Sequence, residues 1–152
     1  MMLDDTDRKI LTILQQDADT ALAKIAERVG LSQTPCWKRI RKMTELGIIR
    51  KKVVLLDREK LGRSLVGFIQ IRVPHHTEDW LAAFSKVIVD IPQVIECHRM
   101  AGDIDYLLKV SLRDISEYDD LYKRMIRAID MSDVSVSFSM EQLKETTSLP
   151  LY

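Results

Sequence analysis

The 152-residue sequence predicts an α+β chain of two domains, a helical one followed by one built on a β-sheet. Apolar residues recur at helical spacing from residue 4 to residue 46, whereas β-rich segments and amphipathic helices alternate from residue 66 to residue 143. Charge divides the chain in the same way. Residues 1–63 carry 14 Lys+Arg and 9 Asp+Glu, and residues 64–152 carry 9 and 14. This asymmetry indicates a polyanion-binding module joined to a second unit, although a solvated basic face would produce the same count.

Three helices are predicted in the basic part. Asp4 can cap the first helix and Thr20 the second, which Gly30 ends as a left-handed residue. Ser32 can cap the third helix after a short turn. That assignment places Pro35 in the first helical turn, where no intrahelical N–H is lost.

The third helix carries a cationic outer face. Cys36 and Met43 share its apolar side, and Arg39 lies at the boundary, so we interpret Arg39 as the partner of a carboxylate on the first helix. Two helices joined by a short glycine-containing turn are typical of a helix-turn-helix, whose second helix enters the major groove. A bundle that docks protein is the alternative. The residues predicted to contact bases or phosphates are Ser32, Gln33, Thr34, Trp37, Lys38, Arg41 and Lys42.

A basic wing is predicted after this helix. Two short β-prone segments, 48–50 and 53–56, flank Lys51 and Lys52, which would contact phosphates beside the groove. A plain hairpin edge protected by lysines is the alternative. Residues 1–56 are therefore predicted to form a winged helix-turn-helix domain, and the charged segment 57–63 a linker.

Residues 64–152 are predicted to form a ferredoxin-like βαββαβ sandwich. The expected strands are 66–73, 94–100, 106–112 and 134–143, with helices that begin after Thr77 and Asp114. Both helices would cover one face of the antiparallel sheet. We infer that the open face packs on a second copy, giving a two-fold dimer that suits a protein reading two half-sites.

Four segments between Leu3 and Leu151 add a further signal: LDDTDRKILTILQQD, LAKIAERVGLSQTPCWKRIRKMTELGII, MAGDIDYLLKV and SFSMEQLKETTSLPL. Together they resemble the leucine-responsive regulatory protein/AsnC (Lrp/AsnC) family of prokaryotic transcription regulators. The resemblance implies an effector-sensing (RAM/ACT-like) C-terminal domain, dimers that assemble into octamers, and gene control by a small molecule, usually an amino acid. TPCWKR, PHHTEDW and TTSLPL resemble the branch that includes regulators of cysteine detoxification, which makes cysteine a candidate effector.

The resemblance also implies an effector site between dimers of the C-terminal domain. Asp103 or Asp105 could accept an ammonium group, and Gly102 would let the backbone approach the ligand closely. Without the resemblance, Gly-Asp-Ile-Asp would be interpreted as an ordinary hairpin turn. The residues predicted to bind the effector are Met100, Gly102, Asp103, Asp105 and Tyr106, with Ser135 and Ser137 on the final strand.

No catalytic, cofactor or metal site is predicted. The three histidines show no metal-ligand spacing with Cys36 and Cys97, and neither a phosphate-binding glycine loop nor a nucleophile elbow is present in the sequence. No apolar run approaches the roughly 18 residues that span a bilayer. Two distant cysteines make no disulfide framework, so we expect a cytoplasmic, nucleoid-associated protein.

These patterns together predict a transcription regulator that binds double-stranded DNA under the control of an amino acid, and that is not an enzyme. The alternative is a ligand-binding regulatory subunit of an enzyme, with a helical domain that docks protein.

Overall fold

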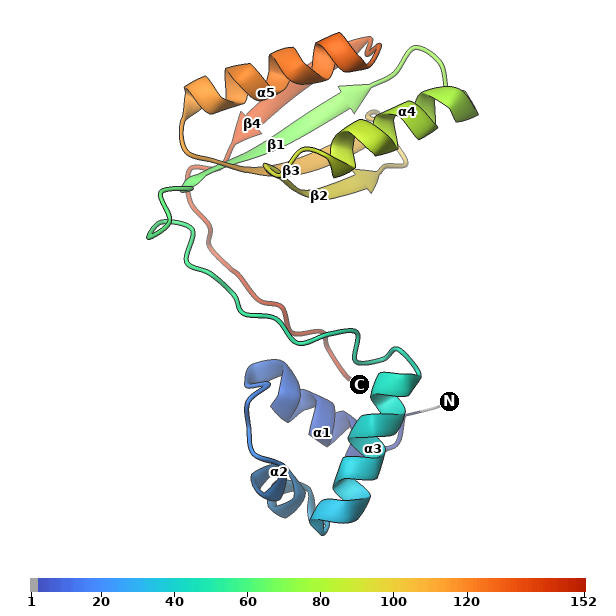
Figure 1. Ribbon diagram of the computed structural model, residues 1–152, viewed down its shortest axis with the longest axis vertical. Helices are drawn as coiled ribbons and strands as arrows, with labels where there is room; N and C mark the ends of the chain where they lie inside the picture. Colours follow the sequence, from blue (N-terminus) through green and yellow to red (C-terminus); the bar gives the residue numbers. More distant parts are fainter. Residues whose placement is uncertain (1–2) are drawn as a thin grey trace. The chain divides into compact units, whose positions relative to one another are not determined.

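The computed structural model describes residues 3–152, which form two compact units (Figure 1). The helical unit contains the residues up to Val54 together with Leu143–Tyr152, and the sheet unit is Leu55–Gln142. The last ten residues were expected to belong to the C-terminal domain. They join the helical unit instead, because the Gln15 side chain donates to the Leu149 carbonyl at 3.1 Å and accepts the Leu149 N–H at 2.6 Å.

The helical unit has three helices, α1 (Asp5–Gln16), α2 (Leu22–Val29) and α3 (Gln33–Glu45). Asp4 and Asp7 form a reciprocal capping box at the start of α1. The N-cap of α2 is Ala21 rather than Thr20, because the Thr20 hydroxyl donates to the Asp17 carbonyl within the preceding loop. Gly30 ends α2 with a φ of 71°, as expected. The buried apolar side chains of this unit are Ile10, Leu11, Ile25, Ala26, Cys36 and Met43.

The predicted wing strands are not formed: within the part of the chain that the structure describes, no strand lies between α3 and residue 65. The N–H groups of Ile48 and Ile49 both donate to the Met43 carbonyl, at 2.9 and 3.1 Å. They close the C-terminus of α3 and are therefore unavailable to a strand ladder.

The sheet unit contains β1 (Leu65–Arg72), α4 (Glu78–Val89), β2 (Val94–Arg99), β3 (Tyr106–Leu112), α5 (Ile115–Ala128) and β4 (Asp133–Phe138). Its strands are antiparallel in the order β2-β3-β1-β4, so the predicted ferredoxin-like arrangement is confirmed (Figure 1). Thr77 and Asp114 cap α4 and α5 through their side chains. β4 ends at Phe138, which pairs with Gly67, rather than at residue 143. The Ser139 N–H makes one more bond, to the Val66 carbonyl at 2.8 Å, and β1 begins at Leu65, so residues beyond 140 have no partner in β1.

Helices α4 and α5 cover one face of this sheet. Ile69 and Ile71 of β1 are buried against that side together with Phe84 of α4 and Met125 of α5. The register places the intervening residues on the opposite face, which we call the open face. Its side chains include Val66, Phe68, Gln70, Glu96, His98, Leu107, Lys109, Ser135 and Ser137.

A buried carboxylate lies where the linker segment meets α5. Glu117 is 8% exposed and accepts hydrogen bonds from the Arg113 backbone N–H at 2.7 Å, from Gln93 at 3.1 Å and from Arg63 at 3.3 Å. The Arg113 N–H is the main cause that lowers the pKa of Glu117 from its ordinary 4.5 to about 2. Because Arg63 also donates to the Ser111 carbonyl at 2.7 Å, the end of the linker segment is fixed to the sheet unit.

Candidate nucleic-acid interface and effector site

The outer face of α3 is open to solvent. The packing of α3 explains this exposure, because Cys36 and Met43 on the other side of the helix are completely buried in the core. Trp37 leaves 47% of its surface exposed. All nine residues predicted to bind DNA are exposed: Ser32, Gln33, Thr34, Trp37, Lys38, Arg41, Lys42, Lys51 and Lys52.

Arg39 is turned away from this face, as predicted. Its Nη1 lies 2.7 Å from Asp4 and 2.8 Å from Asp7, both at the start of α1. The Asp7 backbone N–H, and then Arg39, lower the pKa of Asp4, and the two carboxylates raise the pKa of Arg39. Arg39 therefore joins α3 to α1 and leaves the outer face to the other cations.

The two lysines of the expected wing differ in their contacts. The Lys52 ammonium donates to the Ala18 carbonyl at 2.9 Å, in the loop between α1 and α2. Among the described residues, Lys51 has no side-chain hydrogen bond or ion pair. Of the two, Lys51 is the cation that an approaching phosphate could bind without first breaking a contact.

The loop between β2 and β3 contains most of the predicted effector residues and is fixed at its end by Asp105. The Asp105 carboxylate accepts the Val73 N–H at 2.8 Å, and its other oxygen lies 3.1 Å from His76 Nε2. The Met100 N–H donates to the Asp105 carbonyl at 2.8 Å, which closes the loop. Asp105 thus already has partners within the chain, whereas Asp103 is exposed and its carboxylate makes no hydrogen bond or ion pair with the described residues.

Sequence reasoning missed Arg72, which lies beside this loop at the end of β1. Its Nε donates to the Asp103 carbonyl at 2.7 Å, and its Nη1 lies 3.2 Å from Asp133 at the start of β4. Arg72 therefore brings the loop next to the strand that carries Ser135 and Ser137. The signal in the sequence is a single arginine that ends a strand with no other charged residue.

The other predicted effector residues occupy two sides of the sheet. Tyr106 is 4% exposed, and the centre of its ring lies 4.5 Å from the ring centre of Phe84 in α4. Ser135 and Ser137 are exposed on the open face. Met100 and Gly102 are exposed in the loop, where Gly102 has a φ of 138°, a conformation that favours glycine.

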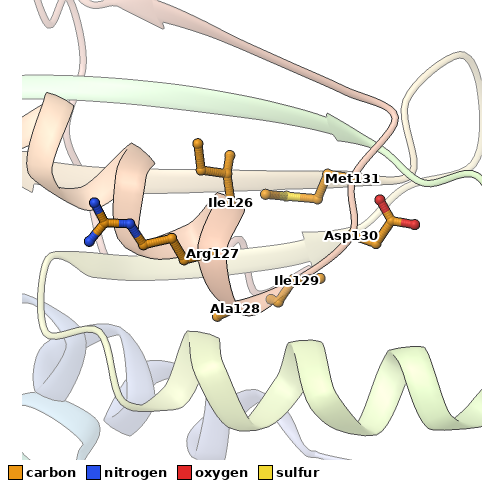
Figure 2. A pocket seen from close by; sticks show the side chains of 6 residues that line it. All are labelled: Ile126, Arg127, Ala128, Ile129, Asp130 and Met131. Atoms are coloured by element: carbon orange, nitrogen blue, oxygen red, sulfur yellow. The ribbon is translucent and has the colours of Figure 1, made fainter.

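A shallow hollow lies at the C-terminal end of α5, and the predicted effector residues do not line it (Figure 2). Ile126, Arg127, Asp130 and Met131 are among its lining residues. In the close-up, the Arg127 and Asp130 side chains point in opposite directions, so they do not converge on one ligand (Figure 2).

Two family models match the chain. The winged helix-turn-helix DNA-binding model matches residues 3–50, and the Lrp/AsnC ligand-binding domain model matches residues 66–149. The chain belongs to the Lrp/AsnC family. The resemblance noted in the sequence and the predicted two-domain α+β fold are thereby confirmed.

Individual Lrp/AsnC proteins agree over almost the whole chain. The DNA-binding transcriptional activator DecR of Escherichia coli is 46% identical, over 99% of this chain and 99% of its own. The crystal structure of an AsnC family transcriptional regulator from Agrobacterium tumefaciens is 52% identical, with a TM-score of 0.94 and 97% of each chain covered. The regulator NMB0573 of Neisseria meningitidis, solved as a complex with L-Met, is 31% identical with a TM-score of 0.93, over 98% of this chain and 97% of that one. The chain is a DNA-binding transcription regulator with a ligand-binding domain.

Neither cysteine of this Lrp/AsnC chain is among the residues predicted to bind DNA or the effector. Cys36 is buried in the helical core, as predicted, and burial raises the pKa of its thiol. Partial burial also raises the pKa of Cys97, the opposite of the lowered pKa that makes a thiol reactive. In residues 3–152, no group of three His, Cys, Asp or Glu side chains could hold a metal ion, and no helix is long and apolar enough to cross a membrane.

Proposed function

We propose that the chain binds duplex DNA through the outer face of α3 and that an amino acid held at one end of its sheet controls this binding. The observation that carries the proposal is the orientation of α3. Its apolar side is buried in the helical core, while the side chains of Lys38, Arg41 and Lys42 are exposed on the opposite side, where a phosphate backbone could approach them.

A salt titration tests the DNA interface. If each of two half-sites makes about three phosphate contacts, log K should fall with log[salt] at a slope near −5. A helical unit that docks protein instead would show a nearly flat response to salt in a DNA-binding assay. The duplex is one selected from a random pool by the wild-type protein, with binding followed by fluorescence anisotropy.

Paired substitutions locate that interface. Lys38→Ala with Arg41→Ala should weaken duplex binding at least tenfold, since each removes a cation from the proposed contact surface. Lys86→Ala with Lys123→Ala removes the same charge from helices of the sheet unit and serves as the matched control. Equal affinity of the two double variants would refute this placement of the interface.

The effector in the proposal is a zwitterionic amino acid beside the loop between β2 and β3. Its ammonium would be accepted by the Asp103 carboxylate, which has no hydrogen-bond or ion-pair partner among the described residues, while Arg72 would supply donors for its carboxylate. The loop would be supported from within the chain by Asp105 and the ring of Tyr106. The remaining walls of the amino-acid site would be formed by Met100, Gly102, Ser135 and Ser137. The complex of NMB0573 with L-Met supports an amino acid as the class of ligand.

Calorimetry with all twenty amino acids tests this site, and cysteine is the first candidate. An amino acid that binds the wild type should lose at least tenfold in affinity with Asp103→Asn and with Arg72→Gln. Asp120→Asn, which removes an exposed charge from α5, is the control. Unchanged affinity in both the Asp103→Asn and the Arg72→Gln variants would show that these residues do not bind the amino acid.

We further propose that two copies pack through the open face and that such dimers assemble into an octamer. Val66, Phe68 and Leu107 place apolar side chains on this face, which no element among the described residues covers. Ligand binding between dimers would then act through different affinities for the assembly states. This arrangement supplies the two half-site readers that a helix-turn-helix regulator uses.

Analytical ultracentrifugation tests this assembly. Gln70→Lys places a charge at the centre of the open face without touching the core, and it should convert the dimer into a monomer. Ser116→Lys adds the same charge at an exposed position of α5 and should leave the assembly intact. A Gln70→Lys protein with wild-type mass would exclude the open face as the interface.

The proposal assigns the chain no catalytic activity and no cofactor, in line with the regulator names of its relatives. It also places the chain with the nucleoid in the cytoplasm. A fluorescent fusion should colocalise with DNA in cells, and the Lys38→Ala/Arg41→Ala variant should spread evenly.

A further inference from the structure

Three side chains form a row along the outer face of α3. Trp37, Arg41 and Glu45 are spaced four residues apart, so they stand one above another on the helix surface. The Arg41 Nε donates to Glu45 Oε1 at 2.6 Å, and Arg41 Cζ lies 5.4 Å from the centre of the Trp37 ring. The arginine is therefore held on one edge by a carboxylate and on one face by an indole.

Helix stability does not explain the pair of Arg41 and Glu45. Both side chains are about 60% exposed, and the arginine precedes the glutamate, which is the weaker order for a pair of this spacing. Glu45 is the only acidic residue of α3, and it lies on the face proposed to approach phosphates. A carboxylate there opposes DNA binding through like-charge repulsion, so its presence calls for another explanation.

We propose that Glu45 and Trp37 are positioning residues for Arg41 and that Glu45 makes binding selective for sequence. An arginine can grip guanine O6 and N7 through its two terminal nitrogens or through Nε and one terminal nitrogen. The contact with Glu45 occupies Nε, which leaves Nη1 and Nη2 with no other partner among the described residues. Arg41 can then bind guanine only through Nη1 and Nη2. Binding to phosphates alone is weakened by repulsion from the Glu45 carboxylate.

The inference rests on the proposed interface, and its test compares two duplexes. One is the duplex selected from a random pool, and the other has the same composition in shuffled order. Glu45→Gln should tighten binding to the shuffled duplex and lower the ratio of the affinity for the selected duplex to that for the shuffled one about three- to tenfold. The slope of log K against log[salt] should become steeper by about 0.9 for each subunit. Glu45→Asp keeps the charge but shortens the reach to Nε, so it should lower the ratio without tightening binding to the shuffled duplex.

Matched variants complete the design. Asp5→Asn removes an acid from α1 that is paired with Arg8, and it should change both affinities by the same factor. Trp37→Ala should weaken binding to the selected duplex more than to the shuffled one, and Trp37→Phe should restore part of the loss. Because all these side chains are exposed, the variants should fold, which thermal melting confirms.

The outcomes separate the two proposals. If Lys38→Ala with Arg41→Ala weakens binding to both duplexes while Glu45→Gln behaves like Asp5→Asn, the interface stands and the positioning role is overturned. If the double variant changes neither affinity, α3 is not the interface and both proposals fall.

Discussion

Arg39 and Asp7 form an ion pair across two helices, with Arg39 Nη1 2.8 Å from Asp7 Oδ1. Asp7 is only 5% exposed, and its second carboxylate oxygen accepts the Asp4 N–H at 3.3 Å. The pair therefore couples the N-terminal cap of α1 to the middle of α3. It fixes the rotation of α3, and with it the direction in which the proposed DNA-contacting residues point.

Removing this arginine should loosen the helical unit. Arg39→Met leaves Asp7 buried without its charged partner, and we expect a loss of about 3 kcal/mol in the free energy of unfolding of that unit. Amide hydrogen exchange of α1 and α3 peptides measures it. Arg8→Met breaks only the exposed pair with Asp5 and should cost less than about 1 kcal/mol. Similar exchange in the two variants would contradict the central role of the buried pair.

Glu117 makes the sheet unit sensitive to acid. Its folded-state pKa of about 2 lies below the ordinary 4.5, so its contribution of roughly 3 kcal/mol is complete above about pH 4.5 and is lost as pH falls towards 2. In Glu117→Gln, urea unfolding should depend less on pH across this window. Trp80 reports the sheet unit when Trp37, the other tryptophan, is replaced by Phe. Asp119→Asn, on the exposed side of α5, is the control and should keep the wild-type slope.

Gly102 should matter to the effector loop through its backbone. At a φ of 138°, an alanine would be strained by about 1–3 kcal/mol, although nothing within 4 Å would meet its Cβ. We expect Gly102→Ala to weaken binding of the effector amino acid about tenfold in calorimetry. Gly62→Ala, at a φ of 66° and equally free of neighbours, strains the linker segment instead and should leave that affinity unchanged. An equal loss in both variants would point to a general effect of strain.

The two lysines after α3 should contribute unequally to DNA binding. Lys51→Ala should weaken binding to all duplexes alike and reduce the salt slope by about 0.9 for each subunit, because Lys51 is a phosphate contact in the proposal. Lys52 already donates to the Ala18 carbonyl, so Lys52→Ala should have the smaller effect. Anisotropy at several salt concentrations measures both, and a larger effect of Lys52→Ala would reverse the assignment.

Local signals predicted most of the fold. The bounds of β3 and the caps Asp4, Thr77 and Asp114 follow from neighbouring residues in the chain. The inward turn of Arg39 follows from its place at the boundary of the apolar side of α3. These features depend on helical periodicity and on side chains that bind the nearest backbone groups, which a single sequence displays.

Features set by distant partners were missed. The end of β4 depends on where β1 begins, and the wing segment depends on how the Met43 carbonyl is used. In the candidate effector site, Asp103 and Asp105 looked equivalent, because only the fold brings Val73 and His76 to one of them. Arg72 was missed for the same reason, because its partners Asp103 and Asp133 lie 31 and 61 residues away along the chain.

The contact between Gln15 and Leu149 has a practical consequence for anyone who dissects this regulator. The sheet unit is an insertion between two pieces of the helical unit, so no single contiguous fragment contains the whole DNA-binding half. A protein cut after residue 54 would leave Gln15 without its backbone partners and would lose Leu151 from the apolar cluster. Isolated helical fragments would therefore understate the stability that this half has in the intact chain.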